Sequence, residues 1–486
     1  MLQGHLPDSG LVRVSSDRRV GPDRVAALMD GCAGSGAAYA ALADGLRSAV
    51  LAGALPPRTR LPGERELAAA LGISRTTVST AYDVLRGEGY LVSRQGSGTV
   101  TALPGGVRLS PRFSDLPGAD LLDLTKAAPG QPPELAAACE AAVDDLRHVA
   151  GRGYSSFGLP SLRAALADWY DERGVPTTSE QILVTTGAQH AIHLLMGLFA
   201  GRGDRVALEH PTYPLAIEAV RSAGARPVPV PVGAAGVDVE LLRATVARTD
   251  PRLAYLIPDF QNPTGTVLDP ESRSAVRSVL ARAGVPLVVD EAFSELAFGE
   301  PAPSLVAGDG RAVIGIGSSS KAYWGGLRVG WVRAHPELVA RLAARRASMD
   351  VGTSVLDQLV LVRLLAERHT ILARRRAELR RQRDVLLGLL GTHLPGWSAR
   401  PPAGGLSLWV DLGAPASTAL ALRGPACGVH LVPGTAFGTD GTFDDRLRLT
   451  FGEPEPVLVT AVQRIAEAWA THDRPAPARR PWAPAV

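Results

Sequence analysis

The chain has 486 residues and a formal net charge of +3, and 46% of its residues are hydrophobic and 20% charged. It is too long for one ordinary core, so two or three domains are expected. No apolar stretch reaches the length of a membrane span, and the N-terminus lacks the apolar core of a signal peptide. The three cysteines, Cys32, Cys139 and Cys427, lie far apart, which argues against disulfides and a zinc site. We expect a cytoplasmic protein with no membrane partner and no metal.

Composition changes along the chain predict its domain organisation. Residues 1–35 are polar and Gly-rich without regular periodicity, and they are expected to form a disordered tail. A first domain is expected at 36–102, followed by a Pro- and Gly-rich linker at 103–120. Beyond it, short apolar runs alternate with long Ala- and Leu-rich stretches, which predicts an α/β domain with a mainly parallel sheet over 121–472. A frayed tail is expected at 473–486.

The first domain shows the pattern of a helix-turn-helix. Residues 38–52 place apolar side chains at helical spacing, and a second helix is expected up to Leu71, ended by Gly72. Ser74 then stands at an N-cap position before a third helix over 75–86. In this arrangement the last helix enters the major groove of DNA, with its N-terminal residues on base edges and phosphates.

A β-hairpin is expected over residues 90–100, with its turn at Gln95-Gly-Ser-Gly98, and it would form a wing beside the helices. The whole segment resembles the GntR-type winged helix, whose pattern runs here as Arg60-Leu-Pro-Gly-Glu-Arg-Glu-Leu-Ala, Leu71-Gly-Ile-Ser-Arg-Thr-Thr-Val and Glu88-Gly-Tyr-Leu. Gly63 departs from the pattern, in which Ser is common. The residues expected at double-stranded DNA are Arg65, Ser74, Arg75, Thr76, Thr77, Gly96 and Gly98. The alternative is a winged helix that makes only protein contacts.

The chain contains only two lysines among 51 basic residues, Lys126 and Lys321. Lys321 follows a predicted strand and a loop of small residues, so the fold can hold its amine out of water. Desolvation or a neighbouring cation lowers the pKa of an amine toward neutrality and lets it form a Schiff base. Arginine does not deprotonate and cannot replace it. An ordinary solvated lysine is the alternative interpretation.

Four more candidate residues lie at or just after the ends of predicted strands. Asp290 ends an apolar strand, Asn262 begins a tight turn, Gly187 opens a helix and Tyr213 follows another strand. Each alone has a plain structural explanation, as a helix cap, a β-turn, a helix start or a core tyrosine. Together they match the needs of pyridoxal 5′-phosphate: a phosphate cradle, a stacking ring, a partner for the phenolic oxygen, a carboxylate for the pyridinium nitrogen and a lysine.

The order and spacing of these groups resemble fold-type I, class I aminotransferases, which have a mainly parallel sheet and a small C-terminal α+β subdomain. The resemblance implies that Lys321 forms the internal aldimine, that Asp290 pairs with the pyridinium, and that these two are the catalytic residues. It also implies that Tyr213 stacks on the ring and that Asn262 bonds its hydroxyl oxygen. The residues that it implies around the phosphate are Gly187, Ala188, Gln189, Ser318, Ser320, Arg328 and, from the partner subunit, Tyr154. Arg448 would bind an effector carboxylate.

One departure concerns the ring oxygen. Families of this type usually carry a Tyr two or three residues after the Asp, and here these positions are Ala292 and Phe293. Losing that donor should shift the pKa of the lysine linkage and weaken catalysis without preventing cofactor binding.

A GntR-type winged helix followed by an aminotransferase-like domain resembles the MocR/GabR-type transcription regulators. The resemblance implies a head-to-tail homodimer. Binding of pyridoxal phosphate, or of a small amine or amino-acid effector, would change how the two winged helices are presented to DNA. Two alternatives remain: an active aminotransferase that also binds DNA, and an enzyme with a vestigial winged helix. The identity of the effector, the operator sequence and the sign of regulation stay open.

Overall fold

The computed structural model describes six stretches of the chain and one isolated residue, namely 18–29, 38–51, 55, 59–94, 98–102, 121–439 and 441–470. These residues divide into two compact units, one before residue 103 and one after residue 120. The predicted linker and the predicted C-terminal tail lie outside the described residues. Over the described ranges, no helix is both long and apolar enough to cross a membrane.

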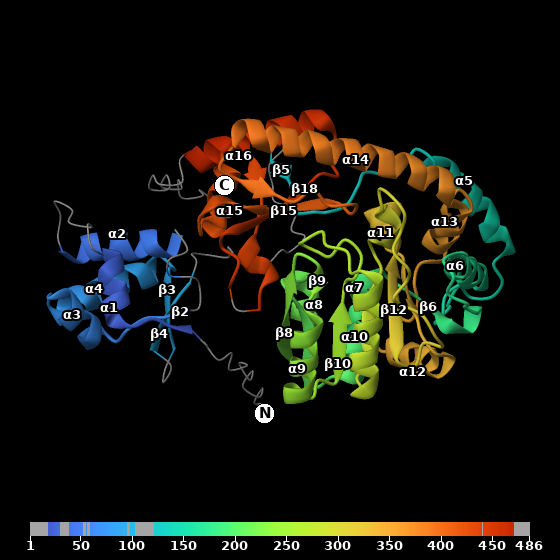
Figure 1. The fold of residues 1–486 in the computed structure, drawn as a ribbon, viewed down its shortest axis with the longest axis horizontal. Helices are drawn as coiled ribbons and strands as arrows, with labels where there is room; N and C mark the ends of the chain where they lie inside the picture. The colour runs from blue at the N-terminus through green and yellow to red at the C-terminus, as the bar shows by residue number, and fades with distance from the viewer. Residues whose placement is uncertain are drawn as a thin grey trace, which may run out of the picture. The chain divides into compact units, whose positions relative to one another are not determined.

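The N-terminal unit combines helices with a small sheet. Its strands lie in the order β1-β2-β4-β3, and β3 and β4 pair antiparallel as the predicted hairpin (Figure 1). The turn of that hairpin, residues 95–97, lies outside the described residues. The elements are β1 (Arg18–Arg19), α1 (Pro22–Met29), α2 (Ala38–Leu51), β2 (Thr59–Arg60), α3 (Glu64–Leu71), α4 (Arg75–Gly87), β3 (Leu91–Arg94) and β4 (Gly98–Thr101).

The predicted helix-turn-helix is confirmed. α3 ends at Gly72, whose φ of +65° is the left-handed conformation that favours glycine after a helix. Ser74 is the N-cap of α4, and its side chain accepts a hydrogen bond from the backbone N–H of Thr77 at 3.0 Å. α2 packs against α4, with Leu46 and Leu85 buried in the shared core. The position of α4 is therefore fixed by both a cap and a core.

The prediction of a disordered tail over 1–35 is wrong for residues 18–29. Arg18 and Arg19 form β1 and pair in parallel with β2. α1 packs on α3, and Val25 and Met29, one helical turn apart, are buried in the core of the unit. This two-turn helix gives too short a periodic signal to be recognised in the sequence, and its apolar face is stabilised only by tertiary packing.

The second unit is built on an eight-stranded sheet in the order β6-β13-β12-β11-β10-β7-β8-β9. The strands β12, β11, β10, β7 and β8 run parallel, and β13 lies antiparallel between β12 and β6. Every residue of β6, β10 and β11 is buried, as expected for strands covered on both faces. The predicted mainly parallel sheet is thus confirmed. The strands are β6 (Ile182–Thr185), β7 (Arg205–His210), β8 (Arg226–Gly233), β9 (Gly236–Val237), β10 (Leu253–Leu256), β11 (Leu287–Asp290), β12 (Val313–Ser318) and β13 (Gly330–Arg333).

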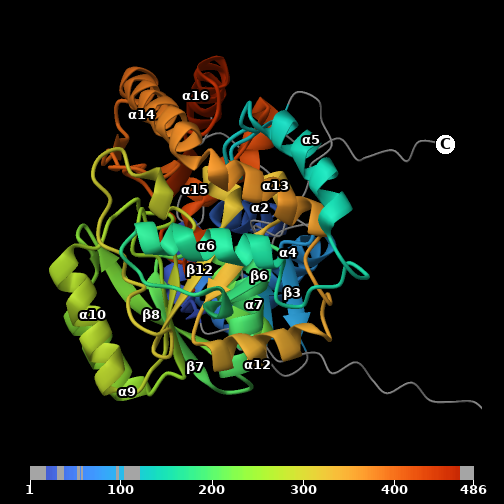
Figure 2. The same cartoon turned by 90° about the vertical axis from the view of Figure 1, so that its right-hand side faces the viewer.

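Helices cover this sheet. α9 and α10 pack against each other, and Figure 2 shows them at the left, on the flank of the sheet that carries β7 and β8. α6 packs against β6, and α13 packs against both α5 and α6. The helices are α5 (Leu135–Asp145), α6 (Pro160–Glu172), α7 (Ala188–Phe199), α8 (Pro214–Ser222), α9 (Val239–Thr249), α10 (Pro270–Arg282), α11 (Ser319–Ala322), α12 (Pro336–Arg346) and α13 (Val355–Ala366).

A small α+β subdomain completes the unit, as predicted. Its sheet has the order β14-β15-β18-β17, and β5 pairs with β16 beside it. The 26-residue helix α14 packs against α16, and in Figure 1 it extends from the side of α13 to that of α16. The elements are β5 (Leu122–Asp123), α14 (Arg368–His393), β14 (Ser398–Ala399), β15 (Ser407–Asp411), α15 (Ser417–Arg423), β16 (Val429–His430), β17 (Val432–Pro433), β18 (Arg446–Thr450) and α16 (Glu455–Ala470).

Candidate functional site

The carboxyl ends of the parallel strands meet at one edge of the large sheet, where ligands bind in open α/β folds. Lys321 follows β12, and Asp290 is the last residue of β11. The chain leaves β6, β7 and β10 at the same edge and then reaches Gly187, Tyr213 and Asn262. The structure therefore brings together, at one edge, residues that the sequence spreads over more than 130 positions.

The start of α7 forms a cradle suited to an anion. Gly187 has a φ of +83° and a ψ of 167°, a conformation nearly restricted to glycine. A Cβ at this position would lie 2.9 Å from Nη2 of Arg328, so the absent side chain leaves room for the guanidinium. The following residues, Ala188 and Gln189, belong to the first turn of a helix, where backbone N–H groups lack intrahelical acceptors.

Two serines and an arginine lie beside this cradle. The hydroxyls of Ser318 and Ser320 are 2.9 Å apart, and the Ser318 hydroxyl also caps the short helix α11. Arg328 adopts a φ of +52° and remains exposed. Its Nη2 lies 3.5 Å from the Thr186 carbonyl oxygen, next to Gly187. Ser318 is buried and Ser320 half-buried. A guanidinium and two hydroxyls around helix N–H groups that lack intrahelical acceptors are suited to bind a phosphate.

Lys321 is half-buried and faces other charged groups. Its Nζ donates a hydrogen bond to the carbonyl oxygen of Ala127 at 2.7 Å. Burial lowers the pKa of Lys321 to about 8, and the neighbouring Arg448 adds to this effect, while Asp290 opposes it. An amine in this state reaches its neutral, nucleophilic form near physiological pH.

Asp290 is 5% exposed and is held by two donors. The hydroxyl of Tyr255 donates to its Oδ2 at 2.7 Å, and the backbone N–H of Ala292 donates to its Oδ1 at 3.0 Å. Burial raises the pKa of Asp290 in spite of these bonds. A second buried carboxyl, Glu209 in β7, is 2% exposed and accepts from the Ile257 N–H at 2.9 Å, and burial raises its pKa to about 8.

Three further predicted residues border the site. Asn262 is buried, and its Oδ1 has no hydrogen-bond partner among the described residues. Tyr213 is half-buried at the start of α8, and burial, followed by the charge of Asp290, raises its pKa. The Gln189 side chain donates from Nε2 to the carbonyl of Leu215 at 3.2 Å, so its side chain is directed toward α8.

Arg448 and Phe293 both lie near Lys321. Arg448 is buried in β18 and donates to the Thr125 carbonyl, and its Nε has no partner within the part of the chain that the structure describes. Burial lowers its pKa to about 10. The Phe293 ring centroid is 5.6 Å from Nζ of Lys321. At the position where related families carry a phenol, this chain presents an apolar ring to the lysine.

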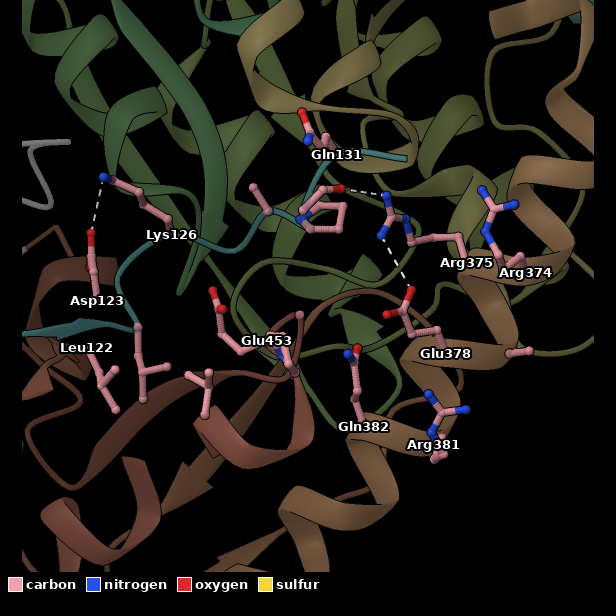
Figure 3. A pocket seen from close by; sticks show the side chains of 18 of the residues that line it. Leu122, Asp123, Lys126, Gln131, Arg374, Arg375, Glu378, Arg381, Gln382 and Glu453 are labelled. Carbon is pink, nitrogen blue, oxygen red and sulfur yellow. Dashed lines mark hydrogen bonds and ion pairs between the residues drawn. The ribbon is translucent and has the colours of Figure 1, made fainter. Parts of the chain in front are cut away.

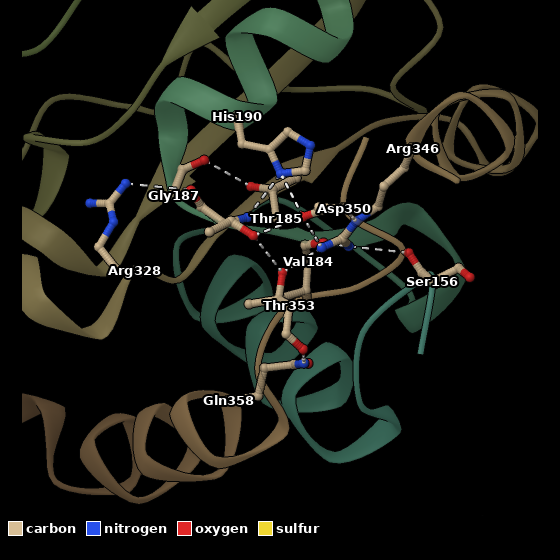
Figure 4. A network of polar contacts seen from close by, with 11 residues as sticks. Ser156, Val184, Thr185, Gly187, His190, Arg328, Arg346, Asp350, Thr353 and Gln358 are labelled. Atoms are coloured by element: carbon tan, nitrogen blue, oxygen red, sulfur yellow. Dashed lines mark hydrogen bonds and ion pairs between the residues drawn. The ribbon is translucent and has the colours of Figure 1, made fainter. Parts of the chain in front are cut away.

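Tyr154 is 79% exposed, so its predicted contact with a partner subunit stays a prediction. The loop that carries it is nevertheless tied to the cradle by a polar network (Figure 4). Arg346 is fully buried, donates to the carbonyls of Ser156 and Val184, and pairs with Asp350 through Nε at 2.6 Å. Asp350 accepts from the Thr186 hydroxyl at 2.9 Å, directly before Gly187.

The same network reaches the first turn of α7. The backbone N–H of Thr186 donates to Nδ1 of His190 at 3.2 Å, and burial lowers the pKa of that histidine. Thr353 accepts from Arg346 at 2.6 Å, and its own carbonyl accepts from Gln358 at 2.9 Å. A buried, largely satisfied network of this kind makes the local geometry rigid. It identifies Thr186, Arg346 and Asp350 as positioning residues of the cradle.

In the N-terminal unit, the predicted DNA contacts gather at the start of α4. Ser74, Arg75 and Thr76 are exposed there, and Thr77 is half-buried because it contributes to the cap. Arg75 lies 3.2 Å from Glu64, which binds it in an exposed ion pair. Arg65 in α3 is exposed. The last two predicted DNA contacts are the wing glycines. Gly98 begins β4 with a φ of +81°, and Gly96 lies outside the described residues.

The sequence interpretation missed several groups that the fold adds to the site. Tyr255 and Glu209 lie inside apolar strands and belong to no recognisable motif. A Glu is rarely buried in such a strand, so its position was the one available signal. Arg346 ends α12 and Asp350 lies in the following turn, four residues later, a spacing that also occurs on many solvated helices. No local pattern points to the carbonyls of Thr125 and Ala127.

Comparisons with known proteins agree with this geometry. The family model for aminotransferase class I and II matches residues 123–465, and that for bacterial regulatory proteins of the gntR family matches residues 38–100. The chain is 34% identical over 320 residues to the 2-aminoadipate transaminase of Thermus thermophilus, covering 64% of this chain and 79% of the relative. It is 32% identical over 388 residues to the probable rhizopine catabolism regulatory protein MocR of Rhizobium meliloti, covering 72% of this chain and 77% of the relative.

A solved structure also resembles the second unit. The α-aminoadipate aminotransferase LysN of Thermus thermophilus, complexed with N-(5′-phosphopyridoxyl)-L-leucine, has a TM-score of 0.67 and 32% identity, covering 73% of this chain and 93% of LysN. The family match indicates pyridoxal phosphate as the cofactor. The residues present fit it, because the cradle at Gly187 excludes a Cβ and the buried Asn262 Oδ1 and Arg448 Nε have no protein partner among the described residues. The chain therefore belongs to the class I and II aminotransferase family, and its gntR-family domain makes it a protein of the MocR/GabR type.

Proposed function

We propose that this protein is a transcription regulator whose N-terminal unit binds a DNA operator and whose C-terminal unit senses pyridoxal phosphate together with an amine effector. The observation that carries the proposal is the combination of two complete parts in one chain. A capped helix α4 with exposed Arg75 and Thr76 precedes a unit that retains the cradle, the buried Asp290 and Lys321. Since DNA is the partner, we place the activity in the cytoplasm.

For the DNA reader, we assign the two predicted types of contact to different residues. The start of α4 enters the major groove, where Ser74, Arg75, Thr76 and Thr77 meet bases and phosphates. Arg65 and the wing glycines, Gly96 and Gly98, meet the backbone. Arginine contacts to phosphate release counterions and make binding depend on salt, whereas contacts to base edges give specificity.

For the sensor, we assign the phosphate to the start of α7 together with Ser318, Ser320 and Arg328. When bound, pyridoxal phosphate supplies an aldehyde that reacts with amines. Lys321, with its pKa lowered to about 8 by burial, provides the neutral amine that anchors it. Asp290 and Asn262 orient the ring, and Tyr213 covers one face. Arg448, next to Lys321, binds the carboxylate of an amino-acid effector.

One feature favours sensing over rapid turnover. Phe293 places an apolar ring beside Lys321, so the hydrogen-bond donor that tunes the cofactor in related enzymes is absent at this position. Tyr154 is exposed and would complete the phosphate site of a second subunit in a head-to-tail homodimer. Binding of the effector then changes how the two N-terminal units of the dimer are presented to one operator.

A second candidate function is transamination. The 34% identity to a 2-aminoadipate transaminase and the retention of Lys321 and Asp290 favour it. The two candidates are separated by measuring multi-turnover transamination and DNA binding on the same full-length preparation.

The test of the regulator proposal is fluorescence anisotropy with the DNA upstream of the chain's own coding region, with and without pyridoxal phosphate and candidate amines. We expect saturable binding whose affinity changes with the amine. Arg65→Ala should weaken binding and lower the salt slope by about 1, whereas Arg24→Ala, an exposed arginine of α1, serves as the charge-matched control. Absence of DNA binding under all conditions, beside measurable transamination, would overturn the regulator proposal.

A further inference from the structure

A pocket of about 1030 Å³ lies between the segment 123–131, helix α14 and the start of α16 (Figure 3). It is separate from the cofactor site. Lys126 and Ala128 line it, whereas the carbonyls of Thr125 and Ala127 in the same segment are held by Arg448 and Lys321, which do not line it. The segment is thus a wall between two sites.

The floor of the pocket contains buried polar atoms without partners. Gln382 on α14 is 5% exposed, and its Oε1 has no hydrogen-bond partner among the described residues. Figure 3 shows its amide directed into the pocket. Arg375, 8% exposed, donates from Nη2 to the Gly130 carbonyl at 2.7 Å, but its Nε is also without a partner in the described chain. Buried polar groups are nearly always satisfied in native proteins, so these atoms point to a ligand.

One side of the pocket is acidic. Asp123 is charged, because hydrogen bonds from His430 and Thr125 and the ammonium of Lys126 outweigh its burial and hold its pKa below the usual range. Glu453 faces the same space and makes no ion pair or hydrogen bond within the described residues. Burial raises the pKa of Glu453, and the charge of Asp123 adds to this effect. A cation beside Glu453 would relieve this repulsion.

The opposite side, on α14, carries three arginines, Arg374, Arg375 and Arg381, and one acid, Glu378. Arg374 is engaged by Glu134 through two hydrogen bonds of 2.6 Å, but Arg381 is exposed at the edge of the pocket and has no partner among the described residues. Arg375 is paired through Nη1 with Glu378 at 3.5 Å, and its remaining Nε, together with Arg381, offers donors to a carboxylate. Within the described ranges, the pocket therefore presents the unpaired carboxylate of Glu453 on one side and, on α14, unpaired donors of Arg375 and Arg381 together with the unpaired amide oxygen of Gln382.

We propose that this pocket binds a small zwitterion of the amino-acid class, with its ammonium at Glu453 and the Gln382 amide oxygen and its carboxylate at Arg381 and Arg375. This site is additional to the cofactor site and does not depend on the proposed regulatory function. Its volume lies at the upper end of small-molecule sites, so it accommodates an ammonium and a carboxylate separated by several carbon atoms.

The test uses the full-length protein loaded with pyridoxal phosphate and ligand-observed NMR titration. The probes are 4-(dimethylamino)butyrate and 6-(dimethylamino)hexanoate, because a tertiary ammonium keeps one N–H donor but cannot condense with an aldehyde. Hexanoate and N,N-dimethylhexylamine, which lack one charged end, are the controls. We expect saturable binding of at least one zwitterion with an unchanged visible absorbance of the cofactor, and weaker binding of both controls.

Variants locate the binding. Glu453→Gln and Arg381→Gln should each weaken the zwitterion by about tenfold or more, since each removes a charge-assisted hydrogen bond. Glu455→Gln, an exposed position two residues away that does not line the pocket, should leave binding unchanged. Gln382→Leu should weaken binding and raise the midpoint of unfolding without ligand, because it removes an unsatisfied amide. A zwitterion that fails to bind, that binds no better than hexanoate, or that binds Glu453→Gln as tightly as the unmodified protein would overturn the proposal.

Discussion

Replacing Gly187 by Ala tests the cradle directly. The backbone at Gly187 has φ +83° and ψ 167°, a region that costs a residue with a side chain about 1–3 kcal/mol. The added Cβ would lie 2.9 Å from Nη2 of Arg328, so the exposed guanidinium must move away. Losing a charge-assisted hydrogen bond to phosphate weakens binding by about 1.5–3 kcal/mol, or roughly tenfold to a hundredfold in Kd.

Two measurements separate these effects. Six of the seven tryptophans lie in the C-terminal unit, and the seventh, Trp482, lies outside the described residues. Tryptophan fluorescence during urea unfolding without cofactor therefore reports mainly the stability of the C-terminal unit. Visible absorbance during titration with pyridoxal phosphate reports affinity. Gly325→Ala is the matched control, because a Cβ there meets no atom within 4 Å and its φ is not positive. If Gly187→Ala loses no more stability or affinity than Gly325→Ala, the reasoning about the cradle is wrong.

Four further substitutions probe other parts of the molecule. Glu209→Gln removes a buried carboxyl whose pKa rises from 4.5 to about 8 on folding. Because the folded state binds more protons than the unfolded state, the native protein should lose about 3 kcal/mol of stability as the pH rises from 4.5 to 7. The variant should keep this stability, as measured by urea unfolding. Asp350→Asn leaves the buried Arg346 with only neutral acceptors and should destabilise the C-terminal unit by about 2 kcal/mol and weaken pyridoxal phosphate binding. Phe293→Tyr should lower, by about one unit, the apparent pKa of the pH-dependent visible absorbance of the bound cofactor, since a phenol donor stabilises a charged ring oxygen. Ser74→Ala removes the N-cap of α4 and should cost about 1 kcal/mol, measured as faster amide hydrogen exchange in that helix.

Each expectation has a contrary outcome. Stability curves of the native protein and Glu209→Gln that stay parallel from pH 4.5 to 7 would mean that Glu209 is not protonated in the folded state. An Asp350→Asn protein with unchanged cofactor affinity would reduce the network to a purely structural role. An unshifted titration in Phe293→Tyr would place the ring oxygen beyond reach of position 293. Unchanged exchange in Ser74→Ala would mean that the cap contributes nothing to α4.

The sequence by itself determined the local parts of this protein. The cap at Ser74, the glycine after α3, and the strands that lead to Gly187, Asp290 and Lys321 follow from residue types at fixed spacing, because short-range capping, backbone conformation and apolar periodicity create them. Their order along the chain was also enough to recognise the family and the cofactor, which the comparisons then supported.

The tertiary structure decided what these parts contact. Lys321 finds its acceptor at Ala127, 194 positions earlier in the chain, and Arg346 reaches Ser156 across 190. The helix at 22–29 is held by a core that its own sequence cannot supply. The zwitterion pocket arises where a connecting segment, α14 and the start of α16 converge. Such contacts depend on packing between distant elements, and burial then sets the charge states of Lys321 and Glu209, which no local pattern encodes.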